Sequence, residues 1–319
     1  MPKRRITQQQ QHQITRQQQQ RLTSQHATQQ SGLLITQHGK HAMVEASDGT
    51  LYHCSLRQHL GSLVAGDRVI WHPVKNQQGV ITAKQPRATV LAKPTARGEL
   101  KPVAANIDQV IIVIAIKPKF STLLLDSYLV ACATLDLSPL ILINKCDLLT
   151  PDDELTTTID LYMQLKYPVM YTSVPAQQGL TQLKDQLKTF TSVFVGQSGV
   201  GKSSLISYLL PHETIAIGDL SIKQPYGKHT TSTSRLYHLT GGGDLIDSPG
   251  VREFGLWHLP ANQIAQGFTE FRPWLGQCKF RDCRHQQEPG CAILAAMEKQ
   301  QIDPRRFYNY QQLVVQYSS

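Results

Sequence analysis

The sequence predicts a multidomain protein in three folded parts: an N-terminal β-barrel, a central α/β domain with a parallel sheet, and a mainly helical C-terminal region. Three observations predict it. Short strand-like runs separated by turn signals fill residues 33–93, apolar strands alternate with helices over 104–258, and cysteines cluster with a histidine within 259–319. A chain of 319 residues is long enough for each part to bury a core.

Residues 1–32 form a Gln-rich, basic tail that we expect to be disordered alone, because it holds too few large apolar residues to offset the entropy of ordering. The tail lacks the apolar centre of a secretory signal, and the longest apolar run, VIIVIAI at 110–116, has the length of a strand. We therefore expect a cytoplasmic protein without a membrane partner, whose six cysteines are reduced or metal-bound.

The formal net charge of +9 is concentrated at the N-terminal end. Residues 1–30 carry five Lys or Arg and no acidic residue, and residues 31–103 carry nine against four acidic residues. A localised basic region indicates a polyanionic partner, most often nucleic acid, although a solvated, solubilising face would carry the same charge.

Residues 33–93 have the spacing of a small β-barrel. Five runs rich in strand-forming residues, separated by turns, are GLLITQHGKHAMVEA, TLYHCSL, RVIWHPV, QQGVITAK and ATVLAK. We expect an OB-fold, with an SH3-like barrel as the alternative, because periodicity does not separate the two. Tyr52 and Trp71 are candidates for stacking on RNA bases, although either also suits a barrel core. Residues 94–103 are expected to be a linker.

Residues 104–258 show the alternation of an α/β domain. The apolar runs QVIIVIAI, PLILIN and YPVMYT alternate with helical segments at 122–136, 151–166 and 179–189, before TSVFVG leads into a helix at 204–210. Buried strands that alternate with helices predict a parallel sheet covered on both faces.

Residues 196–203, GQSGVGKS, fit the phosphate-binding pattern G-x-x-x-x-G-K-[ST] between a strand and a helix, which is the context that the pattern requires. The glycines let backbone N–H groups wrap the phosphates at a helix N-terminus, Lys202 reaches the β- and γ-phosphate oxygens, and the Ser203 hydroxyl binds Mg²⁺. The sequence therefore predicts a nucleoside triphosphatase.

Three further strings predict that the base is guanine. NKCD, at 144–147, follows a strand, so Asp147 lies where ligands bind in such sheets, and its carboxylate can accept guanine N1–H and N2–H₂, which adenine does not offer. TSV, at 172–174, would support the base from the other side, and DSPG supplies Asp247 toward Mg²⁺ with Gly250 placed to sense the γ-phosphate. The expected nucleotide-binding residues are Asn144, Lys145, Cys146, Asp147, Thr172, Ser173, Val174, Gly196, Gln197, Ser198, Gly199, Val200, Gly201, Lys202, Ser203, Ser204, Asp247 and Gly250.

These elements resemble those of Ras-like GTPases in a different order. In that superfamily the phosphate loop comes first, then D-x-x-G, N-K-x-D and a Ser-Ala element, whereas here N-K-x-D and TSV precede the phosphate loop. Because strand pairing does not depend on chain order, the arrangement predicts a circularly permuted GTPase domain. The permutation also joins the segment after Gly250, which is expected to move on hydrolysis, directly to the C-terminal region.

Hydrolysis is expected to depend on YGKHTTSTSR, a polar segment that suits a mobile switch. The expected catalytic residues are Lys202, His229, Thr230 and Thr231, and the expected magnesium ligands are Ser203, Asp247 and one of the two threonines, which we place at Thr230. Val251 stands where Ras-type proteins carry a water-orienting Gln, so we expect slow intrinsic hydrolysis of roughly 10⁻⁴ s⁻¹. His229 is our hypothesis for the water-orienting group once a partner orders the segment, with an ordinary surface histidine as the alternative.

The C-terminal string CKFRDCRHQQEPGC has metal-ligand spacing. Cys278, Cys283, His285 and Cys291 provide three thiolates and one imidazole within a short loop, a complete tetrahedral set for a structural Zn²⁺. A reduced, unliganded cluster is the alternative. No position is left open for substrate, so we do not expect a catalytic zinc.

Taken together, these strings closely resemble the ribosome small-subunit-dependent GTPase A family, also called RsgA or YjeQ. The matching strings are NKCD, GQSGVGKSSL, GKHTTS, DSPG followed by VREF, and CKFRDCRHQQEPGC, which lie within residues 33–310. The resemblance implies a bacterial cytoplasmic GTPase that binds the 30S subunit, contacts 16S rRNA through its OB and zinc domains, acts late in 30S maturation, and is stimulated by the subunit. Two positions depart from the family: Val174, where Ala is usual, and Ser232, where Thr is common.

Two other interpretations stay open. The chain could be an RNA-binding module that uses GTP as a structural ligand, or a permuted GTPase that acts on the large subunit. Turnover stimulated by 30S particles separates the first from the family prediction, and co-sedimentation with 50S particles would favour the second. No amphipathic or coiled-coil element demands a dimer, so we expect a monomer.

Overall fold

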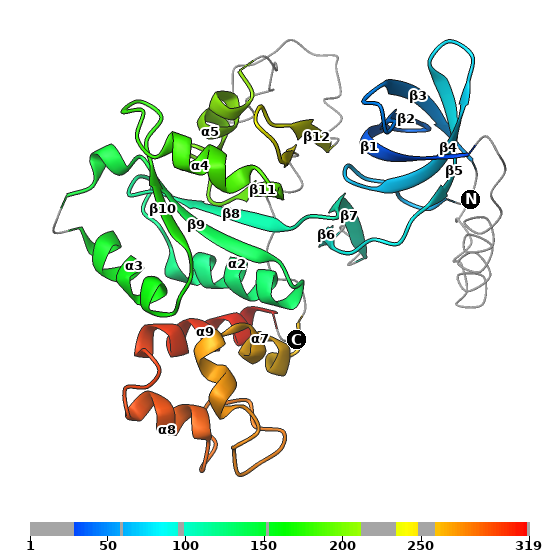
Figure 1. Ribbon diagram of the computed structural model, residues 1–319. Helices are drawn as coiled ribbons and strands as arrows, with labels where there is room; N and C mark the ends of the chain where they lie inside the picture. Colours follow the sequence, from blue (N-terminus) through cyan, green and yellow to red (C-terminus); the bar gives the residue numbers. More distant parts are fainter. Residues whose placement is uncertain are drawn as a thin grey trace, which may run out of the picture. The chain divides into compact units, whose positions relative to one another are not determined.

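The computed structural model describes residues 29–57, 60–94, 99–150, 153–211, 234–247 and 259–317 (Figure 1). These residues fall into two compact units. The first holds the described residues up to 106 together with residues 234–237 and 246–247. The second holds the described residues from 107 to 211, residues 238–245, and residues 259–317.

The first unit contains a five-stranded barrel. Its strands are β1 (Gln30–His38), β2 (His41–Glu45), β3 (Leu51–Leu56), β4 (Arg68–Val74) and β5 (Gln78–Lys84). They are ordered β1-β2-β3-β5-β4, and β4 pairs back onto β1, which closes the barrel. Strands β3 and β5 are parallel and the other barrel pairings are antiparallel. This order and the single parallel pairing are those of an OB-fold, which decides between the two expected barrels.

The apolar side chains of the barrel pack around Trp71, whose side chain is fully buried. Gly32 and Gly79 flank the indole, and a Cβ on either residue would come within 2.7 Å of a Trp71 ring atom. Tyr52 is half-buried and its ring centroid lies 4.5 Å from that of Trp71. Trp71 therefore belongs to the core and does not present a stacking surface, as the sequence allowed.

Two of the expected strand runs fold differently from a simple five-run barrel. The first run, GLLITQHGKHAMVEA, makes two strands, β1 and β2, because the chain turns at Gly39, which has a positive φ of 59°. The last run, ATVLAK, contributes to β6 (Val90–Pro94), which pairs with β7 (Leu100–Ala105) in a separate two-stranded sheet. The segment expected to be a linker, residues 94–103, therefore contains much of β7, while residues 95–98 lie outside the described residues.

The second unit is built on a parallel sheet. Its strands are β8 (Gln109–Ile114), β9 (Ser138–Asn144), β10 (Val169–Thr172) and β11 (Thr191–Val195), in the order β10-β9-β8-β11. Every residue of β8 is buried, as expected for a strand covered on both faces. Asp244 and Leu245, which begin β13 (Asp244–Asp247), extend the sheet beyond β11 in parallel.

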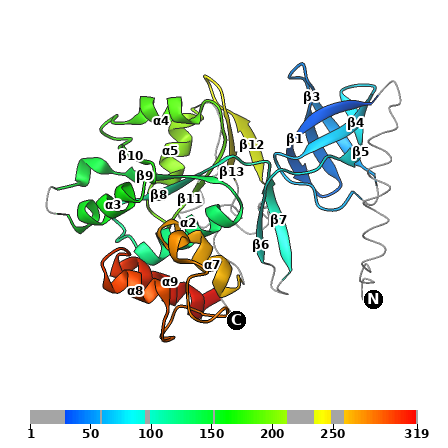
Figure 2. The same cartoon turned by 60° about the horizontal axis from the view of Figure 1, so that its bottom comes forward.

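Four helices follow these strands along the chain. They are α2 (Thr122–Thr134), α3 (Glu154–Gln164), α4 (Leu180–Leu187) and α5 (Lys202–Leu209), close to the ranges expected from the sequence. Figures 1 and 2 show α2 and α3 on one face of the sheet and α4 and α5 on the other. The sheet is therefore covered on both faces, as its apolar strands require.

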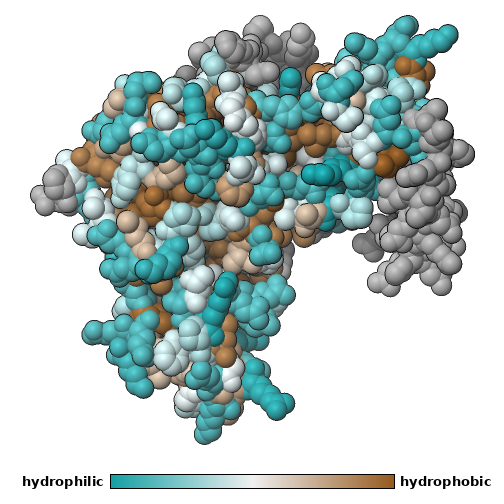
Figure 3. Space-filling view, in the orientation of Figure 1, coloured by the Kyte–Doolittle hydropathy of each residue, from teal (hydrophilic) through white to brown (hydrophobic). Residues whose placement is uncertain are grey.

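The C-terminal helical region, residues 259–317, packs on α2. Its elements are α7 (Ala261–Gly267), the 3₁₀ segment η2 (Thr269–Trp274), α8 (Ala292–Glu298) and α9 (Pro304–Tyr317), and α7 and α9 contact α2. Four aromatic rings form the apolar centre of the region: Phe268, Phe271, Phe307 and Tyr310. Hydrophilic residues cover most of the region on the face shown in Figure 3. Among the described helices, none combines the length and the apolar character needed to span a membrane.

Candidate nucleotide and metal sites

The phosphate-binding loop connects β11 to α5 and depends on two glycines with left-handed backbone. Gly196 has φ of 136° and Gly201 has φ of 98°. A Cβ on Gly196 would collide with the Val113 carbonyl oxygen, and a Cβ on Gly201 would collide with the Asn144 amide. The loop can therefore lie this close to β8 and β9 only with glycine at both positions.

Lys202, the first residue of α5, is buried and folds back over the loop. Its ammonium donates to the carbonyl oxygens of Gly196 and Gln197, both at 2.7 Å. Phosphate oxygens that enter the loop would draw on the same ammonium, because an ammonium group has three donors. The cation is thus already held at the place where phosphates bind in loops of this type.

The N-K-x-D string is bonded directly to the phosphate loop. The buried Asn144 side chain donates from Nδ2 to the Val200 carbonyl oxygen at 2.9 Å, and its Oδ1 accepts the Thr172 hydroxyl at 3.3 Å. Lys145 Nζ donates to the Gly199 carbonyl oxygen at 2.7 Å. The structure therefore joins three of the sequence strings, which lie more than 20 residues apart along the chain, in one site.

The side of this site at which the sequence predicts base binding is open at Asp147. Asp147 is exposed and lies in the 3₁₀ turn η1 (Cys146–Leu148), directly after Lys145, whose φ of 59° turns the chain. The turn leaves the Asp147 carboxylate accessible to a ligand at the carboxyl end of β9, where ligands bind in sheets of this kind.

Ser173 and Val174 follow β10 in a tight turn. Ser173 Oγ accepts the Ala176 N–H at 3.1 Å, and the Ser173 backbone forms an isolated bridge with Gln178. Gln178 Oε1 in turn accepts the Cys146 thiol at 3.4 Å. Gln178 links NKCD to TSV, but it matches no motif, so the sequence carries no signal that identifies it.

Lys117 and Tyr128 also contact the site, although the sequence does not mark either of them. The Lys117 carbonyl oxygen accepts a hydrogen bond from Lys145 Nζ at 3.0 Å. Tyr128, on α2, lines a small cavity together with Gly196 and Gln197 of the phosphate loop. Neither residue lies in a motif, and each is brought to the site only by the tertiary fold.

Some of the remaining predicted residues lie within the described part of the chain and some lie outside it. Ser198, Ser203 and Ser204 lie in the phosphate loop and the first turn of α5, and Asp247 is the last residue of β13. The remaining predicted residues, together with Val251, lie outside the described residues: His229, Thr230, Thr231 and Gly250.

The cysteine and histidine side chains of the C-terminal region meet in one cluster. Each of Cys278, Cys283, His285 and Cys291 offers a ligand atom, and these atoms all lie within 4.8 Å of one another. The Cys278 and Cys291 sulfur atoms are 3.9 Å apart, close to the roughly 3.8 Å that tetrahedral zinc with Zn–S bonds of about 2.3 Å requires. The donor set and its spacing fit a structural Zn²⁺.

The same cluster is connected to the neighbouring helices. The Ala292 N–H, at the start of α8, donates to Cys278 Sγ at 3.4 Å. The Tyr310 hydroxyl on α9 donates to the Arg284 carbonyl oxygen at 2.8 Å. A metal held here would therefore cross-link the loop to α8, and the loop is in turn attached to α9.

The family match and two similar relatives point to one protein family. The chain matches the RsgA GTPase family over residues 84–257. A protein described as small ribosomal subunit biogenesis GTPase RsgA, from Dickeya dadantii (strain 3937), is 50% identical over 295 residues, which cover 89% of this chain and 84% of the relative. One of the same description from Hahella chejuensis (strain KCTC 2396) is 49% identical over 290 residues, covering 89% and 83%.

Two solved structures resemble the whole fold. YjeQ from Thermotoga maritima superposes with a TM-score of 0.76 at 31% identity, covering 91% of this chain and 98% of that one. YloQ, described as a circularly permuted GTPase, superposes with a TM-score of 0.73 at 27% identity, covering 92% of this chain and 96% of that one.

Proposed function

This chain belongs to the RsgA GTPase family, and on that premise we propose that it hydrolyses GTP as an assembly factor of the small (30S) ribosomal subunit, acting late in maturation and stimulated by the subunit. The observation that carries the proposal is the direct bonding of Asn144 and Lys145 to Val200 and Gly199, which unites the guanine-reading string with the phosphate loop. We further propose that it acts in the cytoplasm as a monomer.

Guanine recognition is assigned to the exposed carboxylate of Asp147. Guanine presents N1–H and N2–H₂ on one edge, and a single carboxylate can accept both hydrogen bonds, whereas adenine presents an acceptor at N1. Asn144 and Thr172 hold the chain behind that carboxylate, since both are buried and bonded to one another. Ser173 and Val174 would border the base from the β10 side.

Phosphate binding is assigned to the loop from Gly196 to Ser204. Its backbone N–H groups and the Lys202 ammonium would compensate the phosphate charge at the N-terminus of α5. Ser203 and Asp247 would hold Mg²⁺ with Thr230 or Thr231, because hydroxyl and carboxylate oxygens are the ligands that this ion prefers. When bound, the ion would supply positive charge that neutralises the phosphates.

Hydrolysis is proposed to be slow in the isolated protein. Val251 offers no hydrogen bond to an attacking water, and His229 is proposed to orient that water once the subunit orders its segment. Gly250, beside the expected γ-phosphate, would report hydrolysis to the C-terminal region that follows it in the chain.

We propose the expected boundaries for the OB domain over 33–93, the linker over 94–103, the GTPase domain over 104–258 and the zinc domain over 259–319. The expected tail, residues 1–32, overlaps the start of β1 at Gln30. We propose that the OB and zinc domains contact 16S rRNA. The high positive charge of the first 103 residues supports an RNA partner, since Lys and Arg neutralise backbone phosphates and release counterions. One structural Zn²⁺ would be held by Cys278, Cys283, His285 and Cys291.

The test is steady-state GTP hydrolysis by the full chain alone, with 30S subunits and with 50S subunits at fixed salt, with ATP as the control nucleotide. The proposal expects a large rate increase only with GTP and 30S. Equal slow rates under all conditions would instead support an RNA-binding protein that uses GTP as a structural ligand, and stimulation by 50S alone would move the partner to the large subunit.

Two variants sharpen the same assay. Asp147→Ala should abolish GTP binding, while Asp153→Ala, in the capping residue of α3, should leave it unchanged. His229→Ala should keep GTP binding and lose the stimulation by 30S. Retained stimulation in His229→Ala would remove His229 from the mechanism without affecting the guanine assignment.

A further inference from the structure

Helix α2 lies between the nucleotide-binding sheet and the C-terminal helices. Eight consecutive residues, Leu125–Cys132, are buried, so this stretch has no solvent-facing side. The helix contacts β8 and β9 on the sheet and α7 and α9 in the C-terminal helical region. Figure 1 shows it directly below the sheet and above α9.

On the sheet side, α2 reaches the phosphate loop through Tyr128. Tyr128 is buried and lines a small cavity with Gly196, Gln197 and Val200; at about 10 Å³, the cavity has room for at most one water molecule. Burial raises the pKa of Tyr128 to about 12, so the phenol stays neutral at physiological pH. A hydrogen bond with the Gly196 backbone, across this shared cavity, opposes burial and lowers the pKa of the Tyr128 hydroxyl.

Gly196 is therefore held from two directions. Lys202 donates to its carbonyl oxygen, and Tyr128 bonds to its backbone from the α2 side. Bound phosphates would share the Lys202 ammonium, whereas Tyr128 is only 5% exposed. Tyr128 is thus one of the side chains that hold the loop, together with Asn144 and Lys145, and it holds the loop at Gly196.

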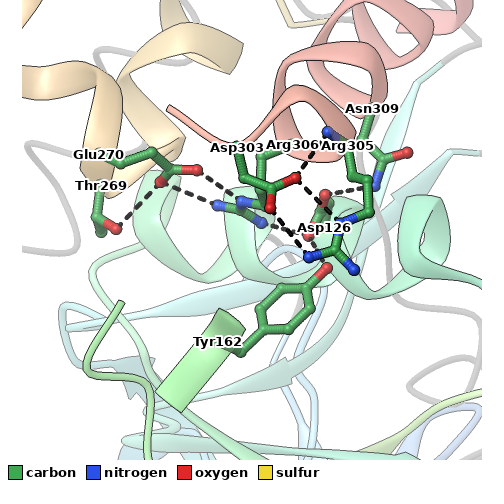
Figure 4. Close-up of polar contacts among 8 residues, drawn as sticks. All are labelled: Asp126, Tyr162, Thr269, Glu270, Asp303, Arg305, Arg306 and Asn309. Atoms are coloured by element: carbon green, nitrogen blue, oxygen red, sulfur yellow. Dashed lines mark hydrogen bonds and ion pairs between the residues drawn. The ribbon is translucent and has the colours of Figure 1, made fainter. Parts of the chain in front are cut away.

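On the opposite side, α2 is fixed to α9 by a buried charge cluster around Asp126 (Figure 4). Arg306 Nη1 donates to Asp126, and Asn309 Nδ2 donates to Asp126 Oδ2 at 2.7 Å. Tyr162 on α3 donates its hydroxyl to Asp126 Oδ1 at 2.7 Å. Arg306 also donates from Nε to Glu270 Oε1 at 2.6 Å, so its guanidinium faces a carboxylate on two sides.

This cluster has a defined geometry, because a guanidinium and two carboxylates that are almost wholly buried must keep their hydrogen bonds. Asp126 and Tyr128 are two residues apart on one helix, and both are buried among their partners. A displacement of α9 would therefore move α2, and with it the hydroxyl that supports Gly196.

We propose that Tyr128 is a positioning residue for the phosphate-binding loop, and that α9 keeps it in place through the Asp126 cluster, so that the C-terminal helices set nucleotide affinity without touching the nucleotide. This inference rests on the nucleotide site of the proposed function. Its test uses GDP binding to the isolated protein, whereas the proposed function is tested by stimulation with ribosomal subunits. Either proposal can therefore fail while the other holds.

The first experiment compares Tyr128→Phe with Tyr308→Phe, which removes the same hydroxyl from an exposed position on α9. Release of fluorescent GDP is measured by stopped flow, and ³¹P NMR of bound GDP reports the environment of its phosphates. Tyr128→Phe should speed GDP release about fivefold and shift the phosphate resonances, because one buried hydrogen bond to the loop is lost. Tyr308→Phe should change neither.

Guanosine, which has the base without phosphates, distinguishes positioning of the phosphate loop from a general loss of structure in the site. Competition by guanosine should weaken little in Tyr128→Phe, so that the ratio of GDP to guanosine affinity falls. Equal weakening of both ligands, or GDP release at the wild-type rate, would overturn the positioning role.

The second experiment tests the connection to α9. Asn309→Ala removes one hydrogen bond to Asp126, and Arg305→Ala is its control, since Arg305 pairs with Asp303 and not with Asp126. Asn309→Ala should speed GDP release about twofold, with no further effect when Tyr128→Phe is already present, because both act through one contact. Additive effects in the double variant, or an equal effect of Arg305→Ala, would remove α9 from the proposal.

Discussion

The barrel and the C-terminal helical region are stabilised in different ways. The barrel closes a ladder of strands around an apolar core centred on Trp71. The C-terminal helical region has helices as short as seven residues, which are not stable alone, and it buries Arg306 with two carboxylates and gathers a Cys₃His cluster. A region without a closed hydrogen-bonded sheet thus depends on a few strong polar links, and the loss of one link should affect it more than a comparable loss affects the barrel.

The largest expected effect comes from metal removal. A chelator added to the full chain should remove the zinc and sharply raise hydrogen exchange in α8 and the loop before it, since structural zinc contributes about 10–16 kcal/mol in small zinc-binding peptides. Exchange in β1–β5 of the same sample should stay unchanged and serves as the internal control. Cys278→Ser should purify without zinc, whereas Cys146→Ser should keep it; zinc retained by Cys278→Ser would contradict the ligand assignment.

Arg306→Met should have the next largest effect. It leaves Asp126 and Glu270 buried without their cation, which costs about 3–5 kcal/mol of unfolding free energy. Urea unfolding, resolved by hydrogen exchange in α2 and α9, measures the change. The matched control is Arg305→Met, next to it on α9 but half-exposed, which should cost less than about 1 kcal/mol. Similar losses in the two variants would mean that the buried cluster is not the principal link.

In the barrel, Asp67→Asn should have a moderate and local effect. The buried Asp67 carboxylate accepts the Val64 N–H at 2.8 Å and pairs with Arg87 through two nitrogen atoms. Replacement by the amide weakens these contacts and should cost about 1.5–3 kcal/mol. Thermal unfolding of the barrel measures the loss, with GDP binding expected to stay at its wild-type value. A larger loss than that of Arg306→Met would reverse the comparison of the two regions.

The smallest expected effect is at Asp303, before the first turn of α9. Burial alone would raise its pKa, but hydrogen bonds from the Arg305 side chain and backbone lower it below the ordinary 3.8. A lowered pKa means that this contribution is present at neutral pH and is lost as pH falls through the folded-state pKa. Asp303→Ala should cost at most about 1 kcal/mol at pH 7, with the difference from wild type shrinking as the pH falls below the ordinary aspartate pKa of 3.8. A difference that persists undiminished at low pH would exclude the carboxylate as its source.

Short sequence motifs were enough to predict the family, the fold class and the GTPase activity. GQSGVGKS, NKCD and the cysteine cluster each supply their chemistry over a few adjacent residues, and their order along the chain indicated the permuted family. The family, the fold class and the GTPase activity expected from the sequence are confirmed by the relatives and by the fold. The nucleotide contacts, the magnesium ligands and the role of His229 stay predictions.

Only the tertiary structure shows which strands and side chains that are distant in the sequence pair with one another. Periodicity identified ATVLAK as a strand but not its partner, because a strand pairs with whichever edge the fold brings to it, and here that is β7. From the sequence, Trp71 is a candidate for base stacking that is more often a core residue in a small barrel, and the contacts of Gly32 and Gly79 with its ring show that it belongs to the core. Arg306 meets Asp126 across 180 residues of chain, and no local pattern marks either of them. Motif chemistry is local and can be read along the chain, whereas burial and partner choice depend on which distant segments the packed helices and sheets bring together.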